Sequence, residues 1–374
     1  MSGIKFDQQQ DAGFYKTLNR RVNDYFKENQ KSKHANAFMV FKSIFFISGM
    51  VILYGLFISD WFTFWQLIPI AALLGLFKAL TGVNIGHDAI HGAYSTSKTM
   101  NGVLGRVFDF LGLNAYAWHI THNVVHHTYT NIPEHDFDIE VSPKLLRLSP
   151  QGPHAPQMRF QQYYAFFLYG LSALIRGYKQ EYKNFFSRDF GDHITPPPPP
   201  KSEYFHLFFW RSFFYVVFLF LPIWLLSLPW WQVFGLFIVS MFIEGLFLGV
   251  IFQMAHIVEK VDFPAPDETG HLTHAWSVHQ MLTTANFASH NWMANFLCGG
   301  LNTQVEHHLF PNICHIHYPN LVPIVAKTAA EFNLPYHQYP TFVAALKSHF
   351  VHLRELGKLD QEVEMEVEKE MKVA

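Results

Sequence analysis

The chain has 374 residues, of which 50% are hydrophobic, 17% aromatic and only 15% charged. This composition argues against a soluble or disordered protein and predicts a membrane protein. The formal net charge of −2 gives no basis for nucleic-acid binding, so no nucleic acid is expected among the partners.

The N-terminal segment, residues 1–37, is polar and basic. No cleavable signal peptide opens it, because lysines and arginines fill the stretch before the first apolar run begins at Phe38. The positive-inside rule therefore places this segment on the cytoplasmic side of a membrane.

Two pairs of apolar runs predict two transmembrane hairpins, over about residues 38–86 and 205–256. Neither connecting turn contains lysine or arginine, so both turns are expected outside and all the longer segments in the cytoplasm. The runs extend from Phe38 to Ile58, from Trp61 to about Ile85, from Phe213 to Leu226 and from Trp231 to Gln253.

The predicted fold class is an all-α integral membrane protein with four transmembrane helices. A cytoplasmic helical cap, about residues 87–204 and 257–352, completes a domain of residues 38–352. Within the cap, the apolar run from Tyr163 to Ile175 is too short to span a bilayer and is expected to lie in the interface. The last segment, residues 353–374, is charged and is expected to be a solvated tail.

Histidine clusters follow the apolar runs. Residues four apart on a helix share a face, so His87 with His91, and His122 with His126, are each expected to hold an ion on one side. About 25 residues separate Trp61 from His87 and Trp231 from His256, or roughly 38 Å of helix, which exceeds the roughly 30 Å hydrocarbon core. The two hairpins thus deliver histidine to one cytoplasmic layer. The predicted metal ligands are His87, His91, His122, His126, His127, His256, His307 and His308.

Eight imidazoles are too many for one ion, so two ions are predicted, and imidazole suits iron, zinc or copper better than calcium or magnesium. Asp88 is expected to accept the N–H of an imidazole and so fix which ring nitrogen meets the metal. Gln304, one turn before His308, is expected to orient a ligand or hold a water molecule.

Two other metal chemistries fit less well. A zinc protease would carry His-Glu-x-x-His, whereas this chain has Asp88 between His87 and His91. A carboxylate-bridged four-helix site would need two inward-facing Glu-x-x-His motifs, and the second match, Glu268 to His271, falls in a Pro/Gly-containing loop.

The clusters resemble the three histidine boxes of the membrane fatty acid desaturases and related hydroxylases. Box one corresponds to residues 87–91, box two to residues 122–127 and box three to residues 304–308. The resemblance implies two non-haem irons at the cytoplasmic face, O2 as co-substrate, and a fatty acyl substrate carried on coenzyme A or a lipid. The histidine that this family has after its fourth helix corresponds to His256. Box three begins with Gln304 rather than histidine, which is similar to front-end desaturases, whose new cis double bond lies toward the carboxyl end.

Many eukaryotic members of that family carry a fused cytochrome b5 domain with a His-Pro-Gly-Gly motif, and this chain has no such motif. An external electron donor is therefore expected, such as ferredoxin or cytochrome b5 with its reductase. The bilayer is a further partner, and the resemblance favours a bacterial inner membrane. Trp118, Phe137 and Trp276 are candidate walls of a substrate tunnel, but ordinary core or interface packing is the favoured explanation of each, so none is assigned.

Two alternatives stay open at the level of sequence. A lipid or carotenoid hydroxylase would use the same metal centre, and the histidine pattern does not separate the two outcomes. A non-catalytic metal transporter would need ionisable residues within the span, where chiefly Lys78 and Glu244 occur.

Overall fold

A computed structural model describes residues 4–7, 13–136, 138–139, 142, 144–175, 181–187 and 198–358, and within these ranges the protein is mostly helical. The all-α prediction needs one correction, because two short parallel strand pairs are present. They join β1 (Lys5–Phe6) to β2 (His271–Leu272), and β3 (Asn286–Phe287) to β4 (Gln338–Tyr339). Two-residue strands leave no periodic signal in a sequence, so composition could not have indicated them.

Four helical stretches within the described residues are long and apolar enough to cross a membrane, as predicted. Asn36 begins the first by accepting the backbone N–H of Met39, and Thr63 forms a capping box with Gln66 at the start of the second. The arrangement as two hairpins across a bilayer stays a prediction. The stretches are α2 (Ala37–Ile58), α3 (Phe64–Thr81) continued by α4 (His87–Ile90), α11 (Lys201–Tyr215) continued by α12 (Leu221–Leu225), and α13 (Trp230–His256).

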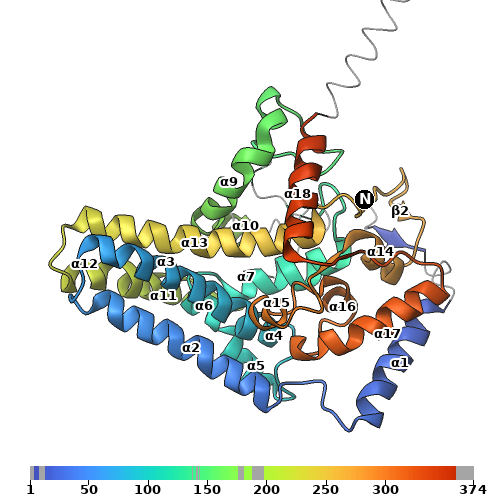
Figure 1. The fold of residues 1–374 in the computed structure, drawn as a ribbon, viewed down its shortest axis with the longest axis horizontal. Coiled ribbons are helices and arrows are strands. Elements are labelled where there is room, and N and C mark those ends of the chain that lie inside the picture. The colour runs from blue at the N-terminus through green and yellow to red at the C-terminus, as the bar shows by residue number, and fades with distance from the viewer. Residues whose placement is uncertain are drawn as a thin grey trace, which may run out of the picture.

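Helix α13 packs along both α3 and α9 (Gln161–Ile175), and α2 packs on α3 (Figure 1). A Cβ atom at Gly75 of α3 would lie only 2.1 Å from the carbonyl oxygen of Ser240 on α13, so these two helices approach as closely as they do because Gly75 has no side chain. Lys78 Nζ also lies 2.5 Å from Glu244 Oε2 within the same interface. The ends of α4 and α13 are therefore held in a fixed relation.

The apolar run from Tyr163 to Ile175 forms most of α9. This helix packs on α13, and its side chains Tyr163 and Phe167 are exposed. At 15 residues the helix is too short to span a bilayer, as the sequence indicated.

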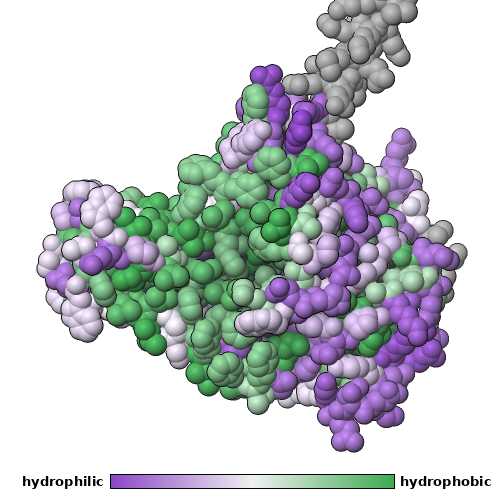
Figure 2. Space-filling model, in the orientation of Figure 1, coloured by the Kyte–Doolittle hydropathy of each residue, from purple (hydrophilic) through white to green (hydrophobic). Residues whose placement is uncertain are grey.

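Shorter helices complete the fold. Figure 1 shows α1, α14, α16 and α17 at the end of the molecule opposite α12, and Figure 2 shows that this end is largely hydrophilic whereas the region over α2, α3 and α13 is largely hydrophobic. The helices are α1 (Phe14–Glu28), α5 (Lys98–Gly105), α6 (Val107–Phe110), α7 (Ala115–Trp118), α8 (His127–Tyr129), α10 (Glu181–Ser187), α14 (Trp276–Thr283), α15 (Trp292–Leu297), α16 (Gln304–Leu309), α17 (Tyr318–Glu331) and α18 (Phe342–Leu356).

The two terminal segments are more structured than their composition suggests. Helix α1 buries Phe14, Leu18, Val22 and Phe26 against α17 and its neighbours, because apolar residues four apart form one stripe. At the other terminus, α18 continues to Leu356, past the position where the solvated tail was expected to begin, because Leu353 is fully buried. Residues 359–374 of that tail lie outside the described residues.

Candidate metal centre

The four histidine clusters converge on one buried site. His87 begins α4, where the second long helix ends, and His256 is the last residue of α13. His307 and His308 lie on α16, a short helix whose six residues are all buried. Box two lies between these elements in the centre of the cluster. Separate parts of the chain therefore supply one constellation, as the sequence predicted.

Box two differs from its prediction in helix type and in grouping. His122 and His126 lie in a π-helical segment, His119–His126, rather than in an α-helix, and a second π-helical segment, Gly82–Gly86, directly precedes His87. His122 and His126, which were expected to grip ions on one helix face, fall into different groups of potential ligand atoms. Residues four apart on a π-helix are related differently from those on an α-helix, and π-helical turns are common at functional sites.

The first group of potential ligands contains four histidines. Their nearest ring nitrogens all lie within 4.8 Å of one another, and His87 Nε2 is 3.2 Å from His122 Nε2. Four imidazoles at this separation match the number of protein ligands that one transition-metal ion takes in a closed site. The group is His87, His91, His122 and His307.

The second group contains three histidines and an amide. The ring nitrogens of His126, His256 and His308 also lie within 4.8 Å of one another. The Gln304 amide nitrogen lies 2.8 Å from His256 Nε2 and 3.2 Å from His308 Nε2, so this side chain occupies the edge of the group where a fourth imidazole would stand.

His127 lies between the two groups. The centre of its ring is 4.3 Å from that of His308 and 4.7 Å from that of His307, and it is 4.8 Å from that of His91. Of the eight predicted ligands, it alone belongs neither to the group of four histidines nor to the group of three. The eighth imidazole therefore adjoins both.

Burial keeps these imidazoles neutral. Burial lowers the pKa of His91, His127, His307 and His308 well below the usual value, and the neighbouring imidazoles lower it further. A neutral imidazole offers a lone pair, which is the form that binds a metal ion.

The ring nitrogens also show that a bound group belongs here. Among the described residues, buried nitrogens without a hydrogen-bond partner include His87 Nδ1, His91 Nε2, His307 Nε2 and both nitrogens of His127. Buried polar atoms are normally satisfied, since an unmet one costs free energy. Metal ions at this position would take one nitrogen from each ring, so the residues present fit the metal centre that the sequence predicts.

The opposite ring nitrogens have fixed partners that sequence reasoning missed. His122 Nδ1 lies 3.1 Å from Asp138 Oδ2, and His126 Nδ1 lies 2.8 Å from Asp136 Oδ2, with both carboxylates buried. His308 Nδ1 donates to Gln280 Oε1 at 2.7 Å. Such partners leave Nε2 as the nitrogen that faces a metal. Two aspartates shortly after box two were the available signal.

Asp88 has a different role from the one expected, because it supports no predicted ligand. Its Oδ2 accepts the Nδ1–H of His315 at 2.8 Å and the thiol of Cys314 at 3.0 Å. Lys42 Nζ lies 2.6 Å from His315 Nε2, so a metal cation beside Asp88 would face an amine. Burial raises the pKa of the Cys314 thiol, so it stays protonated. We therefore regard this cluster as a buried polar network that ties α2 to box one.

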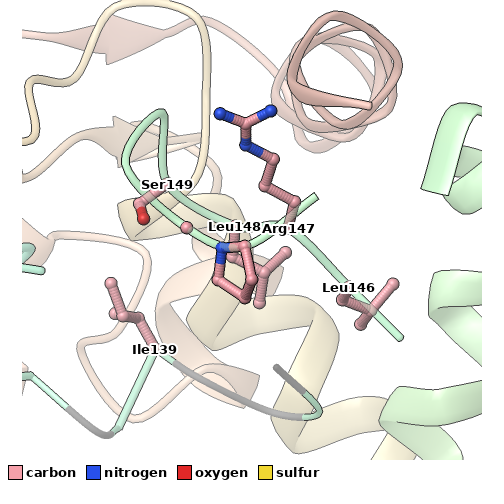
Figure 3. Close-up of a pocket in the computed structure, with 7 residues that line it drawn as sticks. Ile139, Leu146, Arg147, Leu148 and Ser149 are labelled. Atoms are coloured by element: carbon pink, nitrogen blue, oxygen red, sulfur yellow. The ribbon is translucent and has the colours of Figure 1, made fainter. Parts of the chain in front are cut away.

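Two of the three candidate tunnel walls lie beside box two. Trp276 Nε1 donates to the carbonyl oxygen of His127 at 2.9 Å, and the Trp118 ring lies 5.3 Å from that of His122, so both adjoin box two. Phe137 lies outside the described residues. A small, partly open pocket lies next to Ile139, just after Asp138, and its lining is mostly apolar (Figure 3). Its other lining residues are Leu146, Arg147, Leu148, Ser149, Gly152 and Pro153.

Comparison with known proteins agrees with this site. The family model for fatty acid desaturases matches residues 63–340, a range that contains all eight histidines. The chain belongs to the fatty acid desaturase family. It is thus an oxidoreductase of lipid metabolism, and its four apolar helices make it an integral membrane desaturase.

Curated relatives match this desaturase over nearly its whole length. It is 37% identical to the sn-1 linoleoyl-lipid 6-desaturase of Synechocystis sp., over 95% of this chain and 98% of the relative. It is 35% identical to the protein of the same name from Arthrospira platensis, over 92% and 93%. It is 33% identical to the acyl-lipid (8-3)-desaturase of Physcomitrium patens, over 95% of this chain and 74% of the relative.

Proposed function

We propose that this desaturase inserts a cis double bond into an acyl chain carried on a membrane lipid, between an existing double bond and the carboxyl end. The form of box three, with Gln304 ahead of His307 and His308, supports the front-end position. The relatives named linoleoyl-lipid 6-desaturases and acyl-lipid (8-3)-desaturases support a lipid carrier over coenzyme A.

The observation that carries the proposal is the pair of adjoining imidazole groups. One iron ion would be held by the group of four, and a second by His126, His256 and His308. His127 would supply the eighth imidazole between them, and Gln304, in contact with His256 at the edge of the second group, would orient a ligand or hold a water molecule there. When bound, the two irons supply the activation of O2 and the removal of one hydrogen from each of two adjacent carbons.

The protein's own contribution is position and exclusion of water. Asp136, Asp138 and Gln280 fix the imidazole orientations through their hydrogen bonds. Burial of every ligand side chain except the half-buried His91 keeps bulk water from the reacting carbon. Because all methylenes are chemically alike, the reacting pair must be selected by how far the chain enters before its headgroup stops.

We propose that both termini and the metal centre lie in the cytoplasm, in the inner membrane of a bacterium. The links 59–63 and 226–229 contain no lysine or arginine, whereas residues 13–36 contain six. The tryptophans around those links are exposed, as expected for an aromatic belt at the far interface. These are Trp61, Trp65, Trp224, Trp230 and Trp231.

The test is lipid profiling of an expressing host that makes no polyunsaturated fatty acids, fed with an eighteen-carbon diene. A triene two hydrogens lighter than its precursor is expected, with the new bond on the carboxyl side. His308→Ala should lose iron and product together. An oxygenated product would instead establish the hydroxylase alternative, and a new bond on the methyl side would refute the front-end assignment.

A further inference from the structure

The segment that contains helix α1 and the residues just after it concentrates positive charge on a chain that is negative overall. Residues 13–36 contain six lysines and arginines and only two acidic residues, Asp24 and Glu28, whereas the whole chain carries a formal net charge of −2. Lys16, Arg20 and Lys27 are exposed on this helix. The face that they form is here called the α1 basic face.

The inner side of the same helix contacts residues that adjoin the metal centre. The Tyr15 ring packs edge-on against Trp276, with 5.7 Å between the ring centres, and Trp276 Nε1 donates to the carbonyl oxygen of His127 at 2.9 Å. The Tyr15 hydroxyl donates to the carbonyl oxygen of Leu309, the residue after His308, at 3.2 Å. The contact between Tyr15 and Trp276, followed by the hydrogen bond from Trp276 to His127, thus connects α1 with box two. The hydrogen bond from Tyr15 to Leu309 connects α1 with the residue that follows box three.

We propose that the α1 basic face docks the electron donor, a small acidic one-electron carrier protein, and that Trp276 lies on the route from the carrier to the metal centre. This inference rests on the proposed function. Desaturation of –CH2–CH2– to –CH=CH– by one O2 releases two waters and takes up two electrons and two protons beyond the two hydrogens of the substrate. The carrier is oxidised in two successive one-electron encounters, and both protons come from solvent.

The charge pattern favours an acidic carrier, because complementary charges raise the rate of encounter in transient complexes. The position of the helix favours a soluble protein over lipid headgroups. Figure 1 places α1 at the opposite end of the long axis from α12, which carries the exposed Trp224, and Figure 2 shows that the α1 end is hydrophilic. Helix α1 therefore faces away from the hydrophobic band.

The first test measures binding, which does not depend on turnover. The full chain in lipid nanodiscs is passed over an immobilised [2Fe–2S] ferredoxin and, separately, over the soluble haem domain of cytochrome b5. Lys16→Glu/Arg20→Glu should weaken binding to the preferred carrier at least tenfold at low salt, and added salt should weaken wild-type binding similarly. The matched control, Lys260→Glu/Lys347→Glu, changes charge equally at two exposed positions, one of them on α18, and should bind as wild type.

Equal binding by the charge-reversal variant and the control would overturn the docking site. So would an unchanged carrier affinity accompanied by reduced binding of the variant to anionic vesicles, which would assign the α1 basic face to lipid headgroups. The preferred carrier identifies the donor as an iron–sulfur or a haem protein.

The second test separates electron delivery from catalysis. Stoichiometric dithionite, added without O2, reduces the centre without a carrier, so after O2 is admitted Lys16→Glu/Arg20→Glu should form as much product as wild type in a single turnover. Trp276→Phe should bind the carrier normally but lower the carrier-driven rate about tenfold more than its single-turnover yield with dithionite, because it lacks the N–H that contacts His127. An unchanged carrier-driven rate would remove Trp276 from the route. Absence of product from the wild type with dithionite would refute the proposed function instead, and the binding result would stand separately.

Discussion

Replacing Asp136 by asparagine should release iron from the second imidazole group. Asp136 Oδ2 accepts from His126 Nδ1 at 2.8 Å and from the backbone N–H of Asn131 at 2.9 Å, and its Oδ1 accepts from the backbone N–H of Asp138 at 3.1 Å. Asparagine has a single acceptor oxygen, so its amide group must face one of these three donors. At least one buried hydrogen bond is therefore lost together with the negative charge.

The expected magnitude follows from the loss of the partner that orients a ligand. Such losses typically cost about 10- to 100-fold in metal affinity or activity, which corresponds to about 1.4 to 2.8 kcal/mol. The His126 ring is fully buried, so water cannot replace the carboxylate without disturbing the packing. The loss should therefore fall in the upper part of this range.

Iron content after dialysis against a graded chelator series measures the effect directly. Asp136→Asn should fall from two irons toward one at chelator concentrations that leave wild type intact, with turnover falling in parallel. Asp138→Asn should affect the group that contains His122, and Asp267→Asn, at an exposed loop carboxylate, serves as the control. Retention of both irons with wild-type affinity in Asp136→Asn would refute the reasoning.

Three further predictions concern stability. Gly75→Ala should lower the free energy of unfolding by about 1 to 3 kcal/mol and reduce iron content, because the new Cβ meets Ser240. Gly55→Ala is the control, since the space around Gly55 is open, and it should do neither. Equal thermal midpoints for the two variants would contradict this prediction. Lys78→Met should cost about 3 to 5 kcal/mol by leaving Glu244 buried without its partner, and Lys78→Met/Glu244→Leu should recover most of the loss in thermal unfolding. Burial lowers the pKa of His349 from 6.5 to about 4, so the unfolded state binds the extra proton first as pH falls and stability is lost between these values. His349→Gln should flatten that dependence, and an identical slope of thermal midpoint against pH would exclude His349 as a source.

The parts of this protein that could be predicted from sequence are those governed by local composition. An apolar run long enough to cross a bilayer identifies itself, and the helices α2 and α13 begin and end within three residues of the predicted runs. The histidine clusters could be found for a similar reason, because few other functions require so many imidazoles at such short spacing.

The partition of ligands between groups could not be predicted, because it depends on elements that meet only in three dimensions. His122 joins His87 and His307 rather than its neighbour His126, and Gln280, from the distant α14, orients His308. Asp88 illustrates the same limit. It follows His87 in the sequence, yet in the structure its carboxylate accepts a hydrogen bond from His315. Sequence spacing describes one helix at a time, whereas these contacts are set by how helices pack.

The two π-helical segments, Gly82–Gly86 and His119–His126, make the centre sensitive to backbone conformation as well as to side-chain identity. A π-helical turn holds more residues than an α-helical one, so relaxation of a segment to α-helix at unchanged length would rotate the helical residues after it by about 100°. Every histidine would still be present, yet relaxation of Gly82–Gly86 would make His87 and His91, which follow it, point elsewhere. A substitution in these thirteen positions that favours the regular α-helix is thus expected to damage the centre without touching any histidine.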